Sequence, residues 1–369
     1  MTLALARIYR PKTLDDLVGQ QALKHTLAAA IAHDRIAPAY VLTGIRGVGK
    51  TTTARVIARA LNCAHGPTLT PCGTCPSCMA IDSDSTLDVV EIDGASNNGV
   101  DNARELIANI GYAPMQAGAR KIYIVDEAHM LSKSAWNALL KTLEEPPPHV
   151  LFIFATTEAR AIPVTVLSRC QVLALARISM ADIEGRLHWV AAQEKATIAP
   201  DAARAIARAA EGSMRDALSL LDRSLATQPG HVDAESVQAM LGRMGRLAVA
   251  DLVASVVKGD IPDLLARLRA AIDEGRDPMA LLEDSVEWIH QTQMAKKIPS
   301  FPDDLGMPES EKAKLAELTP LAANGALQGC AHYLLEASAQ IRGMPSQALG
   351  VEMALVRAAS KFASLADKT

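Results

Sequence analysis

A glycine-rich segment at residues 44–51 restricts the fold of this chain more than any other feature. It reads Gly-Ile-Arg-Gly-Val-Gly-Lys-Thr and fits the pattern G-x-x-x-x-G-K-[ST]. Residues 39–43 before it are apolar and β-prone, and residues 52–61 after it have the spacing of an amphipathic helix. The glycines are therefore expected in a strand-to-helix turn whose N–H groups surround phosphates, and a chance glycine-rich turn is the alternative.

The residues of this loop have distinct expected roles. Gly44, Gly47 and Gly49 let the backbone turn its N–H groups inward. Lys50 supplies a positive charge to the β and γ phosphates of ATP, and Thr51 supplies a hydroxyl ligand for Mg²⁺. The predicted nucleotide-binding set of the loop is Gly44, Ile45, Arg46, Gly47, Val48, Gly49, Lys50, Thr51 and Thr52.

Composition limits the class of protein. The 369 residues are 49% apolar, enough for packed cores in two or three domains. The net charge of −4 provides no overall basic field, so any contact with DNA must be local. The first residues do not form a secretory signal, and no run reaches the roughly 18 uninterrupted apolar residues of a membrane span. A soluble cytoplasmic protein with no membrane contact is expected.

Four of the six cysteines are clustered. Cys63, Cys72, Cys75 and Cys78 have the spacing C-x8-C-x2-C-x2-C, within a module at about residues 62–80. In a reducing compartment such a set favours metal over disulfides, and four thiolates suit a closed, structural Zn²⁺ site. An iron–sulfur cluster and four independent thiols are the alternatives.

Short apolar runs alternate with helical stretches in the first half of the chain. The runs at residues 40–43, 87–92, 121–125, 150–155 and 171–175 predict a parallel sheet flanked by helices, an α/β nucleotide domain at residues 1–177. Strand patterns largely vanish after residue 177. A helical lid domain is expected at 178–242, with helices near 201–210 and 216–225, and an all-helical domain at 243–369.

The third predicted strand ends in two acids. Asp126 is placed to hold Mg²⁺, and Glu127 to orient and polarise the attacking water. An acidic helix N-terminus is the alternative.

Further motifs carry a family resemblance. They include Arg7-Ile-Tyr-Arg-Pro11, Val18-Gly-Gln20, Glu91-Ile-Asp93, the helix around Asn137 to Pro146, Ala155-Thr-Thr157, Ser168-Arg-Cys170 and Glu211-Gly-Ser-Met-Arg215. With the phosphate loop and the cysteine cluster, they make the chain similar to the AAA+ clamp-loader ATPases of the bacterial DNA polymerase III gamma/tau family. The related delta-prime subunit typically lacks a working phosphate loop. No role is assigned to Lys141 in the shared helix.

The resemblance implies further site residues. Thr157 is implied as a sensor of the γ-phosphate, Arg215 as a second sensor in the lid, and Arg169 as an arginine finger acting in trans on a neighbouring subunit. A strand-end threonine and a solvated helix arginine are the alternatives for Thr157 and Arg215. The adenine and ribose region is implied to include Arg7, Tyr9, Arg10, Pro11, Val18 and Gly19, although Tyr9 equally suits core packing.

The resemblance also implies a function. The chain is expected to be the ATPase motor that loads a sliding clamp onto primed DNA during replication, within a holoenzyme that is a DNA-directed DNA polymerase, a nucleotidyltransferase. Implied partners are delta and delta-prime subunits, further gamma/tau copies, the clamp and primed DNA, near the nucleoid. Residues from 243 onward are implied to form the collar that holds this hetero-oligomer together.

Two features depart from the pattern, and two other functions remain open. Residues 94–99 open a helix expected to turn toward DNA, but they contain no Lys or Arg, and the chain ends before the additional segments of the tau form.

The alternative functions are of two kinds. One is another AAA+ DNA motor, such as a branch-migration helicase. The other is a non-hydrolysing scaffold that binds ATP only structurally.

Overall fold

The structure, a computed structural model, divides into two compact units, residues 1–232 and 233–369. It describes residues 4–33, 35–83, 85–116, 118–305, 307–321 and 326–366. The expected boundary between lid and third domain lay at residue 242, whereas the compact units separate between Val232 and Asp233. The division into three domains stays a prediction.

A five-stranded parallel sheet organises the first unit. The strand order is β2-β3-β4-β1-β5, so β1 lies between β4 and β5. Each strand falls on a run that the sequence predicted, and the expected parallel sheet is confirmed. The strands are β1 (Ala39–Thr43), β2 (Val89–Asp93), β3 (Lys121–Asp126), β4 (Val150–Thr156) and β5 (Gln171–Ala174).

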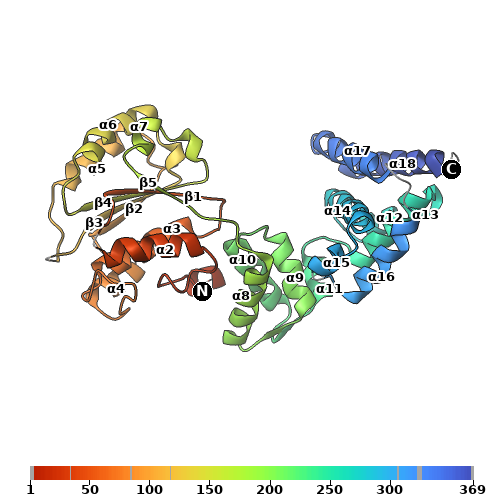
Figure 1. Ribbon diagram of the computed structural model, residues 1–369, viewed down its shortest axis with the longest axis horizontal. Helices are drawn as coiled ribbons and strands as arrows, with labels where there is room; N and C mark the ends of the chain where they lie inside the picture. The colour runs from red at the N-terminus through yellow and green to blue at the C-terminus, as the bar shows by residue number, and fades with distance from the viewer. Residues whose placement is uncertain are drawn as a thin grey trace. The chain divides into compact units, whose positions relative to one another are not determined.

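Helices cover both faces of this sheet, as the continuous apolar runs require. Figure 1 shows α2, α3 and α4 on one side of the strands and α5, α6 and α7 on the other. The helices of this part are α1 (Leu5–Ile8), α2 (Gln21–Ala32), α3 (Lys50–Asn62), α4 (Pro76–Asp82), α5 (Val100–Ile110), η1 (Ala128–Met130), α6 (Lys133–Glu144), η2 (Ala159–Ala161) and α7 (Val164–Leu167).

Aromatic residues are only 3% of the chain, yet several of them gather on one face of the sheet. The rings of Tyr123 and Phe152 stack at 5.6 Å between centroids, and Phe152 stacks on Phe154 at 5.9 Å. Trp136 of α6 reaches Phe154 at 5.0 Å. These side chains are buried and fix α6 over β3 and β4.

The rest of the first unit is mainly helical. It contains α8 (Met180–Gln193), α9 (Pro200–Ala209) and α10 (Met214–Thr227). Ser179 and Ser213 cap α8 and α10 through their side-chain oxygens. Two short strands, β6 (Thr197–Ile198) after α8 and β7 (His231–Val232) after α10, pair in parallel. The sequence patterns did not predict that pair.

The second unit is helical throughout its described residues, as the sequence predicted. Trp288 is fully buried at its centre, with the Arg246 guanidinium 4.8 Å from the ring centroid. Asp284 is also buried and forms an ion pair with Arg243, which satisfies a charge that burial would otherwise penalise. Its helices are α11 (Ala234–Met240), α12 (Arg246–Lys258), α13 (Ile261–Asp273), α14 (Pro278–Lys297), α15 (Phe301–Asp304), α16 (Glu309–Leu318), η3 (Thr319–Leu321), α17 (Ala326–Ile341) and α18 (Gln347–Ala366).

Candidate functional site

The glycine-rich segment forms the turn between β1 and α3. Gly44, Gly47 and Gly49 have φ angles of 155°, 76° and 108°, which L-residues with a Cβ atom rarely adopt. Gly44 also lies so close to β5 that an added Cβ would be 2.7 Å from the Leu175 carbonyl oxygen. The helix then begins at Lys50, two residues before the expected start, so that both Lys50 and Thr51 lie in its first turn.

Lys50 is held inside the loop. Its side-chain Nζ donates to the carbonyl oxygens of Gly44 at 3.0 Å and Ile45 at 3.1 Å. Burial lowers the pKa of Lys50, and the carboxylates of Glu127 and Asp126 oppose that shift. The ammonium group therefore lies at the loop itself, where a bound anion would offset its desolvation.

The hydroxyl of Thr51 meets the acid at the end of β3. Thr51 Oγ1 donates to Asp126 Oδ2 at 2.6 Å, although the two residues are 75 positions apart. The backbone N–H of Glu127 donates to the other carboxylate oxygen of Asp126 at 2.9 Å. Hydroxyl and carboxylate oxygens are the ligand types that Mg²⁺ takes in nucleotide sites, so this pair fits the metal.

Glu127 lies beside this pair in an unusual backbone conformation, with φ of 45°. Its Oε2 atom is 3.5 Å from Thr157 Oγ1 and 3.5 Å from His129 Nδ1. His129 Nδ1 is in turn 3.2 Å from Thr156 Oγ1. His129 carries no motif of its own in the sequence; its position two residues after the acid pair was the available signal.

A pocket of about 90 Å³ lies over the loop. Asp126 and Glu127 reach it from β3, and Arg215 reaches it from α10. Its lining residues are Ala6, Tyr9, Arg10, Pro11, Leu17, Val18, Gln20, Arg46, Gly47, Val48, Gly49, Lys50, Thr51, Thr52, Asp126, Glu127, Ile178, Arg186, Met214, Arg215 and Leu218.

Most residues of the predicted site therefore share one pocket, with six exceptions. Gly44 and Ile45 contribute carbonyl oxygens to Lys50 without lining it, and Thr157 contacts Glu127 from outside. Arg7 lines a neighbouring pocket instead. Gly19 and Arg169 are not among the lining residues either.

The lid helix α10 touches the loop directly. The backbone N–H of Arg215 donates to the Gly47 carbonyl oxygen at 3.3 Å. A Cβ atom on Gly47 would collide with Ser213 Oγ, and Ser213 itself is buried. The side chain that caps α10 therefore occupies the space that a non-glycine residue at position 47 would need.

Helix α8 holds the N-terminal segment against the same pocket. The Tyr9 hydroxyl donates to Glu194 Oε1 at 2.5 Å, and this bond raises the pKa of Tyr9 to about 12. The Tyr9 ring meets Trp189 edge to face at 5.6 Å. Arg186 stacks on Trp189 at 4.1 Å and donates to the Tyr9 carbonyl oxygen at 3.2 Å. Tyr9 thus both packs and lines the pocket, and Arg186 is a lining residue that the sequence analysis missed.

Arg169 lies between α7 and β5. Its guanidinium donates to Glu144 Oε1 and to the Thr165 carbonyl oxygen, each at 2.6 Å. The side chain is 34% exposed and does not line the pocket of its own chain. Within one chain its function would be to join α7 to α6.

The segment at residues 94–99 is a turn held by β2. Asp93 Oδ2 accepts from Ser96 Oγ at 2.7 Å, and the Asp93 carbonyl oxygen accepts from the Asn97 side chain at 3.0 Å. The N-cap of α5 is Gly99, so this helix begins without a capping side chain.

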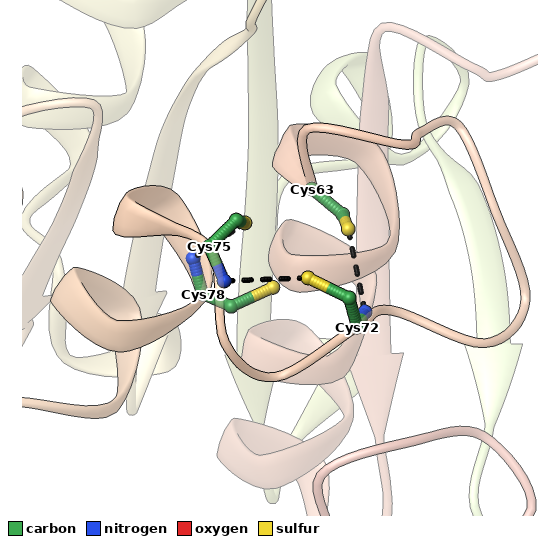
Figure 2. Close-up of side chains that lie close together, drawn as sticks. All are labelled: Cys63, Cys72, Cys75 and Cys78. Carbon is green, nitrogen blue, oxygen red and sulfur yellow. Dashed lines mark hydrogen bonds between the residues drawn. The ribbon is translucent and has the colours of Figure 1, made fainter.

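The four clustered cysteines converge at the junction of α3 and α4 (Figure 2). Their Sγ atoms all lie within 4.8 Å of one another, and the described residues contain no disulfide among them. Zn–S bonds of about 2.3 Å in a tetrahedron place sulfurs about 3.8 Å apart, so four sulfurs gathered this closely are consistent with a zinc site.

Backbone donors surround these sulfurs. The N–H of Cys72 donates to Cys63 Sγ at 3.4 Å, and the N–H of Cys75 donates to Cys72 Sγ at 3.3 Å. Hydrogen bonds from the Thr74 and Cys75 backbone lower the pKa of Cys72 to about 6, whereas burial raises that of Cys78 to about 12. The donors favour thiolates, the form of cysteine that binds metal.

Three family models match successive parts of this chain. A family model described as DNA polymerase III, delta subunit, matches residues 19–179, and one for the ATPase lid domain of a DNA polymerase III clamp loader subunit matches 182–230. A third, for domain III of DNA polymerase III subunits gamma and tau, matches residues 232–369.

Whole-chain relatives agree with the family models. The chain is 39% identical to DNA polymerase III subunit tau of Salmonella typhimurium, and the match covers 96% of this chain and 55% of the relative. It is 40% identical to DNA polymerase III subunit tau of Bacillus subtilis, where the match covers 85% of this chain and 55% of the relative. It is 35% identical to DNA polymerase III subunit gamma of Buchnera aphidicola over 96% of its own length and 98% of the relative. The chain therefore spans about half the length of the tau relatives.

A Gly47→Ala substitution tests the contact between loop and lid. We expect it to lower the free energy of unfolding by about 2–4 kcal/mol, because it combines a left-handed backbone with a collision at Ser213. Gly230→Ala is the matched control, since its φ is 89° and no atom lies within 4 Å of the added Cβ. This control should lower the free energy of unfolding, measured in urea, by about 1–2 kcal/mol. Equal losses for the two variants would contradict a tight contact.

Proposed function

Since the chain belongs to the DNA polymerase III gamma and tau family, we propose that it is an ATP-hydrolysing motor subunit of a clamp loader, which places a sliding clamp on primed DNA. The observation that carries the proposal is the Thr51–Asp126 hydrogen bond beside Glu127, at the mouth of the phosphate loop. A chain that bound ATP only as a structural ligand would have no use for a water-polarising acid at this place.

The proposed binding roles follow from position. Lys50 holds the β and γ phosphates, and the N–H groups of residues 44–51 bind phosphate oxygens. Thr51 and Asp126 would hold Mg²⁺, which when bound offsets the negative charge that develops on the transferred phosphoryl group. Tyr9, Arg10, Pro11 and Val18 line the pocket and are the proposed contacts of the adenine and ribose. Arg7 and Gly19, which lie outside that lining, complete the proposed set.

The proposed hydrolytic roles involve three further residues. Glu127 orients and polarises the attacking water, and Thr157, 3.5 Å from its carboxylate, senses the γ-phosphate. Arg215 reaches the phosphates from α10 and links the lid to the nucleotide, because its own N–H is bonded to Gly47. Arg169 acts in trans, which agrees with its partly exposed side chain, one that does not line the pocket of its own chain.

The proposed function requires an assembly of several subunits. Delta and delta-prime subunits, further gamma/tau copies, the clamp and primed DNA are the proposed partners, and the second unit is the proposed collar. Among the described residues, no helix is both long enough and apolar enough to span a membrane.

We expect ATP hydrolysis to depend on the clamp. In a reconstituted subunit mixture, steady-state hydrolysis should rise about tenfold or more when clamp and primed DNA are both present, because these partners are expected to align neighbouring subunits so that each site receives its arginine from the next one. Lys50→Ala, which removes the phosphate-binding cation, is the blank. Hydrolysis that responded to DNA but not to the clamp would instead favour another DNA motor.

Arg169→Ala should separate binding from hydrolysis. Nucleotide affinity should change less than about threefold, whereas hydrolysis in the assembly should fall on the order of a thousandfold. Arg160→Ala, an exposed arginine on η2, is the control and should leave both unchanged. Mixing Arg169→Ala with Lys50→Ala subunits should restore part of the activity, since the second variant supplies the missing arginine. If the mixture recovered no hydrolysis and Arg169→Ala had lost nucleotide binding, Arg169 would act on the nucleotide of its own chain.

Zinc content tests the cysteine module. We propose that Cys63, Cys72, Cys75 and Cys78 hold one structural Zn²⁺. Purified protein should contain one zinc per chain by elemental analysis, and Cys78→Ser should lose it together with several degrees of melting temperature. Cys330→Ser, another buried cysteine, should keep the metal. Iron with visible absorbance would identify a cluster instead, and metal-free folded protein would show independent thiols.

A further inference from the structure

The carboxylate of Glu127 contacts two residues that do not belong to the pocket. Glu127 lines the pocket over the phosphate loop, whereas His129 and Thr157 are not among its lining residues. Glu127 Oε2 lies 3.5 Å from His129 Nδ1 and 3.5 Å from Thr157 Oγ1. The roles proposed above use Thr157 but leave His129 without one. Its place beside the acid raises the question of what the imidazole does there.

The backbone holds the imidazole next to the acid. His129 lies in the short helix η1, which follows Glu127 and its left-handed φ of 45°. The N–H of Met130 donates to the Glu127 carbonyl oxygen at 2.9 Å. The N–H of Ser132 donates to the Asn98 carbonyl oxygen at 3.1 Å, which ties the end of this segment to the turn after β2. With a side chain that is only 16% exposed, His129 has little room to move away.

The Nδ1 atom of His129 faces two oxygens. It lies 3.5 Å from the Glu127 carboxylate and 3.2 Å from Thr156 Oγ1. An ionised carboxylate only accepts hydrogen bonds, so Nδ1 has to carry a hydrogen for the first contact to be favourable. The Thr156 hydroxyl already accepts from the N–H of Glu158 at 3.0 Å and has a second lone pair for the same Nδ1–H. Glu127 and Thr156 are therefore competing acceptors for one donor.

Thr156 belongs to the rigid part of the site. It is fully buried at the end of β4, and its carbonyl oxygen accepts from the N–H of Gly44 at 3.3 Å. The next residue along the chain is Thr157, the proposed sensor of the γ-phosphate, which contacts Glu127 itself. His129 thus joins the proposed water-polarising acid to the strand end that carries the sensor.

We propose that His129 is a positioning residue for ATP hydrolysis, which donates its Nδ1–H to Glu127 and sets the direction of that carboxylate. This inference rests on the proposed ATPase function and adds to it a group outside the lining of the nucleotide pocket. With Oε2 held by His129 and Thr157, the other carboxylate oxygen is presented to the attacking water. Thr156 competes for the same hydrogen, so the choice between the two acceptors sets how firmly the acid is held.

Three replacements of His129 distinguish positioning from packing. Asparagine puts its side-chain N–H close to the place of Nδ1, whereas glutamine, the larger of the two, puts it close to the place of Nε2. In the reconstituted assembly with clamp and primed DNA, His129→Ala and His129→Gln should lower kcat about tenfold or more, with the Kd for ATP changed less than about threefold. His129→Asn should keep kcat within about threefold, because it retains the donor. Met130→Ala, an exposed neighbour in the same helix, is the control and should leave kcat unchanged.

A second measurement tests whether His129 acts through Glu127. In a Glu127→Gln background, followed by single-turnover hydrolysis, adding His129→Ala should lower the rate less than about twofold, because the carboxylate that it positions is gone. Thermal unfolding of each variant confirms that it is folded.

Three results would overturn the inference alone while the unchanged assembly hydrolyses ATP. They are an unaltered kcat in His129→Ala, equal losses with asparagine and glutamine, and a further loss of about tenfold in the Glu127→Gln background. An unchanged assembly that hydrolysed no ATP would instead overturn the proposed function, and this inference with it.

Discussion

The parallel pairing of β1 with β4 on one side and β5 on the other is the constraint on which the site depends. In a parallel sheet the carboxyl ends of all strands meet at one edge. The N–H of Gly44 donates to the Thr156 carbonyl oxygen at 3.3 Å. The N–H of Leu175 donates to the Thr43 carbonyl oxygen at 2.7 Å. These bonds fix the start of the phosphate loop between two neighbouring strand ends, and the acids at the end of β3 follow from the same register.

Two contacts then tie the lid to this edge, one on each side of the pocket. On the phosphate side, the start of α10 bonds to Gly47. On the opposite side, Arg186 and Glu194 of the α8 region bind the backbone and hydroxyl of Tyr9. A nucleotide bound as proposed would contact the loop, the lid and the N-terminal segment together, and a change in its phosphates would then act on the position of the lid.

The parts that sequence reasoning predicted well are those with a local physical signal. Five apolar runs became five strands, because a strand covered on both faces needs continuous apolar residues. The phosphate loop was readable because its glycines, lysine and threonine have fixed spacing. The cysteines were readable because short spacers with turn residues allow four thiols to converge. His129 and Arg186 were missed, because each owes its place to a partner from another element, Thr156 and Tyr9 respectively.

The sequence by itself therefore determined the elements, the phosphate loop and the family motifs, since each depends on residues near one another along the chain. Only the tertiary structure decided where the N-terminal arginines lie: Arg10 lines the pocket over the phosphate loop, whereas Arg7 lines a neighbouring pocket instead. It also decided that Arg169 pairs with Glu144 within its own chain, and that Asp82 pairs with both Arg59 and Lys12. These outcomes depend on how α3, α4 and the N-terminal segment pack together, and packing between distant segments has no local signature in the order of residues.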